Sequence, residues 1–131
     1  MATINYDRLS QVSLFMGNPF KGIRKFVLIF EDDFIEVKDN KFDKKCEDPY
    51  ITSQEEINYI INELKAIGIE NWDAKYPPQK PSSDQNNWTL QIRYSDKTSN
   101  EYVGCDNYPE GFNKLIELFS KYTFVFDFEE E

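Results

Sequence analysis

The sequence has no histidine in its 131 residues, and it has only two cysteines. Without imidazole, the chain lacks the usual general base near neutral pH, the Ser/His and Cys/His nucleophile pairs, and the commonest metal ligand. Cys46 and Cys105 do not form a CxxC pair, so we expect two free, packed thiols. The sequence therefore predicts a protein that is not an enzyme and that holds no metal and no cofactor.

Long apolar runs are also missing. None approaches the ~20 residues needed to cross a bilayer. The first residues have neither the basic nor the apolar region of a signal peptide, so we expect a cytoplasmic protein without membrane contact. The length suits a single domain, 1–131, whose core is supplied by 11 Phe, 8 Tyr and 2 Trp.

Negative charge, in contrast, is abundant. The formal net charge is -9, of which residues 1–50 carry -1 and residues 51–131 carry -8. Such a field repels phosphate backbones and anionic membranes, and it favours a basic protein partner. The basic clusters at 21–25 and 41–45 stand among nearly as many acids, so direct binding of nucleic acid is not expected.

The first half of the chain reads as a set of short strands. Residues 12–15 are a strand candidate that ends in a turn at 16–19. Residues 24–30 are the most apolar run, which predicts a central strand covered on both faces. A turn at 31–33 then leads to a second hairpin arm at 34–37.

Two amphipathic helices are expected. The first begins at Ser53, which has capping-box spacing to Glu56, and it ends at Gly68. The second opens at 107–109, capped by Asp106 or Asn107. Their apolar stripes are Ile57, Ile60, Ile61, Leu64 and Ile67 in the first, and Phe112, Leu115, Ile116, Phe119 and Tyr122 in the second.

The second helix follows a hairpin. Residues 88–94 alternate between apolar and polar, residues 95–100 are polar, and apolar residues resume at 102–105. Gly104 in this second strand indicates a bulge or a close backbone approach. With a Pro-rich loop (76–87), a last strand (123–128) and an acidic tail (127–131), the whole predicts an α+β fold: a mainly antiparallel sheet with two amphipathic helices packed on it.

Candidate chemistry is sparse. Asp32 and Asp33 could bind a hard cation, but they lack calcium-loop spacing and sit where a hairpin turn is expected. Cys105 precedes a helix, whose dipole could favour its thiolate, yet Asp106 would oppose ionisation. An enzyme that uses Cys105 or the carboxylates of Asp106 and Glu110 remains an alternative.

The carboxylates and aromatic residues of the second half are the candidates for binding a partner. The aromatic residues Trp72, Tyr76 and Trp88 could belong to a binding surface or could instead complete the core. The predicted partner-binding residues are Asp84, Asp96, Glu101, Asp106, Glu110, Tyr108, Trp72 and Tyr76.

Part of the second half resembles a family of small uncharacterised bacterial and mobile-element proteins. The likeness lies in Trp88-Thr89-Leu90-Gln91-Ile92-Arg93-Tyr94, a W-x-L-x-I-x-Y strand, and in the helix entry Asn107-Tyr108-Pro109 after Gly104. This chain has one residue more between Gly104 and Asn107 than the G-x-N-x-Y-P pattern of that family. The resemblance implies an α+β fold in a phage, plasmid or toxin neighbourhood, and it assigns no catalytic residue.

These observations predict a small acidic protein that inhibits a nucleic-acid-handling effector by stoichiometric contact, as an anti-CRISPR or other anti-defence protein does. Its carboxylates would occupy a basic groove built for phosphates, on a nuclease or a CRISPR effector. A toxin-neutralising immunity protein is an alternative of the same physical class. A structural homodimer joined through an exposed edge strand is a further alternative.

Overall fold

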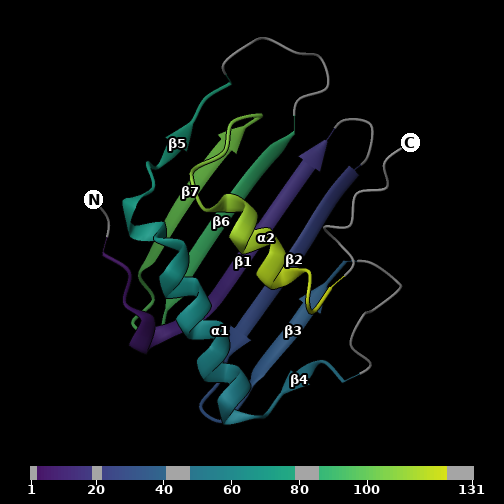
Figure 1. The fold of residues 1–131 in the computed structure, drawn as a ribbon, viewed down its shortest axis with the longest axis vertical. Coiled ribbons are helices and arrows are strands. Elements are labelled where there is room, and N and C mark those ends of the chain that lie inside the picture. Colours follow the sequence, from purple (N-terminus) through teal and green to yellow (C-terminus); the bar gives the residue numbers. More distant parts are fainter. Residues whose placement is uncertain (1–2, 19–21, 41–47, 79–85, 124–131) are drawn as a thin grey trace.

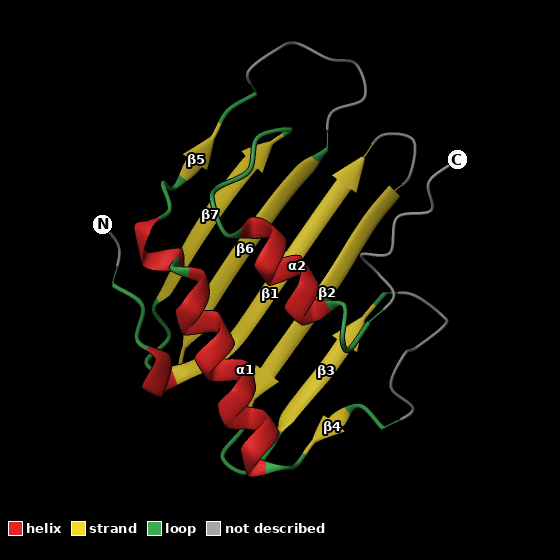
Figure 2. Ribbon diagram, in the orientation of Figure 1, coloured by secondary structure: helices red, strands yellow, loops and turns green. Residues whose placement is uncertain are grey.

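The computed structural model describes residues 3–18, 22–40, 48–78 and 86–123. In this part of the chain, seven strands form one sheet in the order β4-β3-β2-β1-β6-β7-β5. Two helices, α1 and α2, cross the same face of this sheet (Figures 1 and 2). All pairings are antiparallel except that of β5 with β7, so the predicted α+β class with a mainly antiparallel sheet is confirmed.

The first half of the chain forms the β1–β2–β3 meander. Its strands are β1 (Leu9–Asn18), β2 (Gly22–Phe30) and β3 (Ile35–Asp39), preceded by a 3-10 turn (Tyr6–Arg8). The short strand predicted at 12–15 is wrong in length, because pairing with β2 and β6 holds Met16 and Gly17 in the ladder as well. The tip of the first hairpin lies outside the described residues.

The prediction that 24–30 is covered on both faces holds only in part for the described elements. Phe26 and Leu28 face the helices and are fully buried. Lys25, Val27 and Ile29 alternate with them and so belong to the other face, which neither helix covers. Lys25 is exposed and Ile29 is half-buried, whereas Val27 is 4 % exposed. We call this second surface the helix-free face.

Helix α1 (Gln54–Ile67) begins and ends as predicted. The Ser53 hydroxyl accepts a hydrogen bond from the Glu56 N–H at 3.3 Å, and Gly68 has the left-handed conformation, with φ 78°. The helix packs its apolar stripe on the sheet, with Ile60 and Leu64 at its centre.

Two very short strands form the edges of the sheet, and the sequence predicted neither. They are β4 (Tyr50–Ile51), beside β3, and β5 (Lys75–Tyr76), which follows a 3-10 turn (Ile69–Asn71) and pairs with β7. The predicted Pro-rich loop, 76–87, lies outside the described residues from 79 to 85. The same holds for the strand and the acidic tail predicted at 123–131, apart from Thr123, which lies in no strand.

The second half supplies β6 (Asn87–Tyr94), β7 (Ser99–Cys105) and α2 (Phe112–Phe119). The predicted helix start at 107–109 is wrong, as is a cap by Asp106 or Asn107. Helix α2 begins after Gly111, whose φ is 93° and which makes no side-chain cap. The carbonyl of Asn107 is held by the Trp88 indole N–H, so the chain turns into the helix later than its Pro signal indicates.

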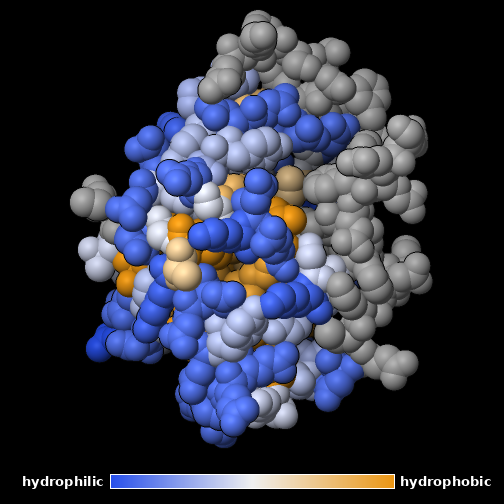
Figure 3. All heavy atoms as spheres, in the orientation of Figure 1, coloured by the Kyte–Doolittle hydropathy of each residue, from blue (hydrophilic) through white to orange (hydrophobic). Residues whose placement is uncertain are grey.

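The core lies between the two helices and the sheet. Phe119 of α2 packs on Phe26 of β2 with 4.7 Å between ring centroids, and apolar side chains are visible between the helices in Figure 3. Neither helix in the described part of the chain has the length and apolar character needed to span a membrane.

Candidate functional site

The structure separates the predicted partner-binding residues. Asp84 lies outside the described residues. One group lies at the end of the sheet where β7 finishes (upper end in Figure 1): Trp72, Tyr76, Asp106, Tyr108 and Glu110. Glu101 lies on the helix-free face, and Asp96 lies in the β6–β7 turn at the opposite end of the sheet.

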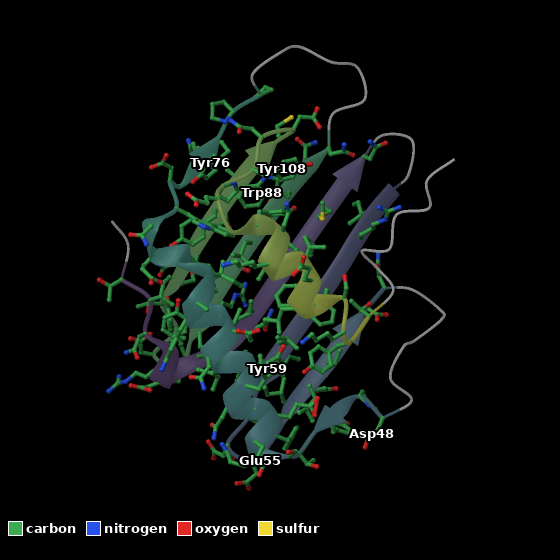
Figure 4. All side chains as sticks on the ribbon, in the orientation of Figure 1. Asp48, Glu55, Tyr59, Tyr76, Trp88 and Tyr108 are labelled. Atoms are coloured by element: carbon green, nitrogen blue, oxygen red, sulfur yellow. The ribbon has the colours of Figure 1, made fainter. Side chains whose placement is uncertain are left out.

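Aromatic rings gather at the upper end around Trp88, a residue we expected to belong to the core or to a binding surface. The Tyr108 ring stacks on Trp88 with 6.4 Å between centroids, and the Tyr76 and Phe112 rings lie at 5.9 Å and 5.0 Å (Figure 4). The Trp72 ring meets Trp88 edge-on at 6.1 Å. These five rings are the aromatic cluster.

The two tryptophans of this cluster are core residues. Trp88 is 1 % exposed and Trp72 is 6 % exposed. Their indole N–H groups donate to the carbonyl oxygens of Asn107 at 2.8 Å and Glu110 at 2.9 Å. Because ring and N–H are both satisfied within the protein, these residues fix the segment before α2, and only Tyr108, 42 % exposed, offers a partner much ring surface.

Asp106 also has a structural role. It has φ 48°, and its carboxylate accepts a hydrogen bond from the Asn86 N–H at 3.0 Å, which ties the end of β7 to the start of β6.

Burial, together with the negative charge of Asp106, raises the pKa of the Cys105 thiol. The thiolate is therefore disfavoured, which weakens the alternative of a Cys105 nucleophile. Among the described residues, no group of three carboxylates or thiols could hold a metal ion.

Carboxylates converge at the opposite, lower end of the sheet. The β2–β3 turn, the β6–β7 turn, the 3-10 turn before β1 and the start of α1 all lie there, as the strand register requires. We call this surface the acidic end, and its residues are Asp7, Glu31, Asp32, Asp33, Glu55 and Asp96. Glu55 is labelled in Figure 4. The same four segments contain two cations, Arg8 and Lys97.

All six carboxylates of the acidic end are exposed. The ion pair present in the described part of the chain, Lys38 with Glu36, does not involve them. The hydroxyl and backbone N–H of Thr98 donate hydrogen bonds to the Asp96 carboxylate and lower its pKa. This carboxylate therefore stays charged to a lower pH than an ordinary aspartate does. The arrangement presents fixed negative charge to solvent on short connections of a paired sheet.

Sequence reasoning found Asp96 but not the surface to which it belongs. It interpreted Asp32 and Asp33 as an ordinary hairpin turn, and this local interpretation holds. The missing step was topological: β6 pairs antiparallel with β1, and this pairing brings the β6–β7 turn to the same end of the sheet as the β2–β3 turn.

A shallow groove of about 310 Å³ separates the two helices. Its floor is formed by the apolar residues Ile67 and Leu118. Its rim carries charged side chains of both signs: Glu63, Lys114, Glu117 and Lys121. Lys121 on this rim has its pKa raised by a hydrogen bond with the Tyr59 hydroxyl, which keeps the amine protonated and unsuited to act as a base.

No family model matches the chain, and no curated protein matches it. The resemblance of its second half to a family of mobile-element proteins therefore stays a prediction.

Proposed function

We propose that the protein is a small, non-catalytic inhibitor that binds the basic surface of a nucleic-acid-handling effector through its acidic end. The observation that supports this is the set of six exposed carboxylates, against two cations, on four segments at one end of the sheet. A CRISPR effector or another defence nuclease fits the role of partner, because its groove is built to hold phosphates.

The physical argument is charge complementarity on a rigid support. Two of the four segments at the acidic end, the β2–β3 and β6–β7 turns, are short and join paired strands, so little ordering is needed when they bind. Exposed charges steer association and set partner choice, and their effect falls as salt screens them. Tyr108, at the far end of the molecule, would be an additional aromatic anchor only for a partner that reaches along the sheet.

Among the alternatives, an immunity protein that neutralises a toxin nuclease would use the same acidic end, and the identity of the captured partner decides between the two. The homodimer alternative has less support. In the described part of the chain, both edge strands have two residues each, and short edges disfavour pairing with another sheet.

Charge reversal at the acidic end tests the proposal. We expect Asp32→Lys combined with Asp33→Lys to weaken partner binding by about tenfold or more, because repulsion replaces attraction at the contact. Affinity capture from a phage- or plasmid-bearing bacterial lysate, with each variant as bait, identifies proteins that depend on these residues. Each captured effector is then purified, and its nuclease activity and its binding are measured over a series of salt concentrations.

The matched control is Asp73→Lys combined with Glu117→Lys. It makes the same charge change at exposed positions outside the acidic end, and it should retain binding and inhibition. A partner that binds both variants equally, or whose affinity is indifferent to salt, would contradict the proposal.

A further inference from the structure

A hollow of about 330 Å³ opens on the helix-free face beside the β6–β7 turn. It lies next to the acidic end but has the opposite character, since it contains two cations, several neutral polar groups and no carboxylate. Its lining residues are Ser10, Gln11, Gln91, Arg93, Tyr94, Lys97 and Ser99. In a chain of net charge -9, a cavity lined in this way is unexpected.

The sheet itself builds this hollow. The register of β1 against β6 shifts between Leu9 and Gln11, which leaves Ser10 as an extra residue beside Arg93. Gln11 and Ser99 are the cross-strand neighbours of Arg93 on its two sides. The guanidinium therefore belongs to a row of neutral polar side chains, and its own strand β6 is paired on both sides.

Lys97 closes the hollow from the turn, at a conformational cost. Its φ is 73°, a left-handed conformation that glycine or asparagine adopts more easily than lysine. The turn is fixed by the Lys97 N–H, which donates to the Tyr94 carbonyl at 3.0 Å, and by the Tyr94 N–H, which donates to the Thr98 carbonyl at 2.9 Å. Glycine would form this turn with less strain, so the turn itself does not need the lysine side chain. What Lys97 adds is a second positive charge in the cavity.

We propose that this hollow binds a small phosphomonoester, such as a sugar phosphate or a nucleoside monophosphate. Arg93 would contact two phosphate oxygens at once, Lys97 would supply a second positive charge, and the hydroxyls of Ser10 and Ser99 would donate hydrogen bonds. The volume exceeds that of phosphate alone and lies at the lower end of the range for small-molecule sites.

Two carboxylates near the hollow bear on this proposal. Asp96 belongs to the same turn, but it accepts both hydrogen bonds from Thr98 and does not line the cavity. Glu101 lies across from Gln91 on the same face and also does not line the cavity. The ligand class is thus a compact anion held at Arg93, and a long polyanion that passes over the carboxylates is disfavoured.

The test is an NMR titration of the full-length protein at constant ionic strength with inorganic phosphate, glucose 6-phosphate and AMP in turn. We expect backbone shifts confined to residues 10–11, 91–94 and 97–99, and tighter binding of the two phosphomonoesters than of inorganic phosphate. Arg93→Gln and Lys97→Gln should each weaken binding at least about tenfold. Lys25→Gln removes an exposed cation from the same face, outside the hollow, and it should change the binding affinity by no more than about twofold.

Lys97→Gly separates the binding role from folding. Glycine suits the left-handed position, so we expect the midpoint of thermal unfolding to rise by roughly 2–4 °C while phosphate binding is lost to the same degree as in Lys97→Gln. Absence of binding by the wild-type protein, equal losses in Lys25→Gln, or undiminished binding by Lys97→Gly would overturn the proposal. The outcome does not depend on the proposed inhibition, which uses other residues and another readout.

Discussion

Replacing Gly104 with alanine is expected to lower the free energy of unfolding by about 2–3 kcal/mol. A Cβ atom built on Gly104 would lie 2.2 Å from Nε1 and 2.5 Å from Cε2 of Trp88. The Trp88 ring has no free space to move into, because it is 1 % exposed and its N–H is bonded to the Asn107 carbonyl. The added methyl group therefore displaces the centre of the aromatic cluster. Urea unfolding followed by tryptophan fluorescence measures the loss.

Gly17→Ala is the matched control for this experiment. Gly17 also lies within a strand of the sheet, but a Cβ atom there meets nothing closer than Ile23, at 3.9 Å. We expect its effect to stay within about 0.5 kcal/mol. Equal losses in the two variants would show that strand glycines are needed for a reason other than the contact with Trp88.

Replacing Trp72 with alanine is expected to cost about 3–5 kcal/mol. The indole contacts Trp88, Tyr102 and Phe112, with ring centroids 5.9–6.2 Å away, and its removal leaves a cavity between α2 and the sheet. It also removes the hydrogen-bond partner of the Glu110 carbonyl, which adds the cost of an unsatisfied polar group. Chemical unfolding of the purified variant, with the transition followed by circular dichroism, gives the size of the loss.

Tyr108→Ala provides the comparison, because the Tyr108 ring belongs to the same aromatic cluster but is 42 % exposed. Its loss is expected to cost about 1 kcal/mol, so the variant stays folded and its partner binding can be measured. A Trp72→Ala variant as stable as Tyr108→Ala would contradict the assignment of Trp72 to the core.

Local signals in the sequence predicted the elements that local physics decides. The Ser53 cap and the Gly68 end of α1 are both found, because each involves only residues within one turn of the helix. The alternation at 88–94 predicted β6, whereas the group that approaches Gly104 closely is the Trp88 ring and not the backbone that the sequence predicted. The helix cap, the helix end and the strand pattern need no partner that is distant in the sequence. The close contact at Gly104 does need one, the Trp88 ring.

Features that depend on distant contacts escaped prediction. Helix α2 begins after the segment in which the Trp88 N–H binds the Asn107 carbonyl. Strand β5 forms because Lys75 and Tyr76 pair with β7, which lies far along the chain. The acidic end required the strand order, which no local pattern gives. For the same reason Trp72 was included among partner-binding residues, although the rings around it place it in the core.

The central position of β1 has a consequence for how the protein is made. One edge of β1 pairs with β2 directly after it in the chain, but the other edge pairs with β6, which ends only at Tyr94. During synthesis the N-terminal hairpin must therefore wait with one open edge until most of the chain has left the ribosome. A nascent chain stalled before β6 would display that unpaired edge, and it would be a target for chaperones and a risk for aggregation.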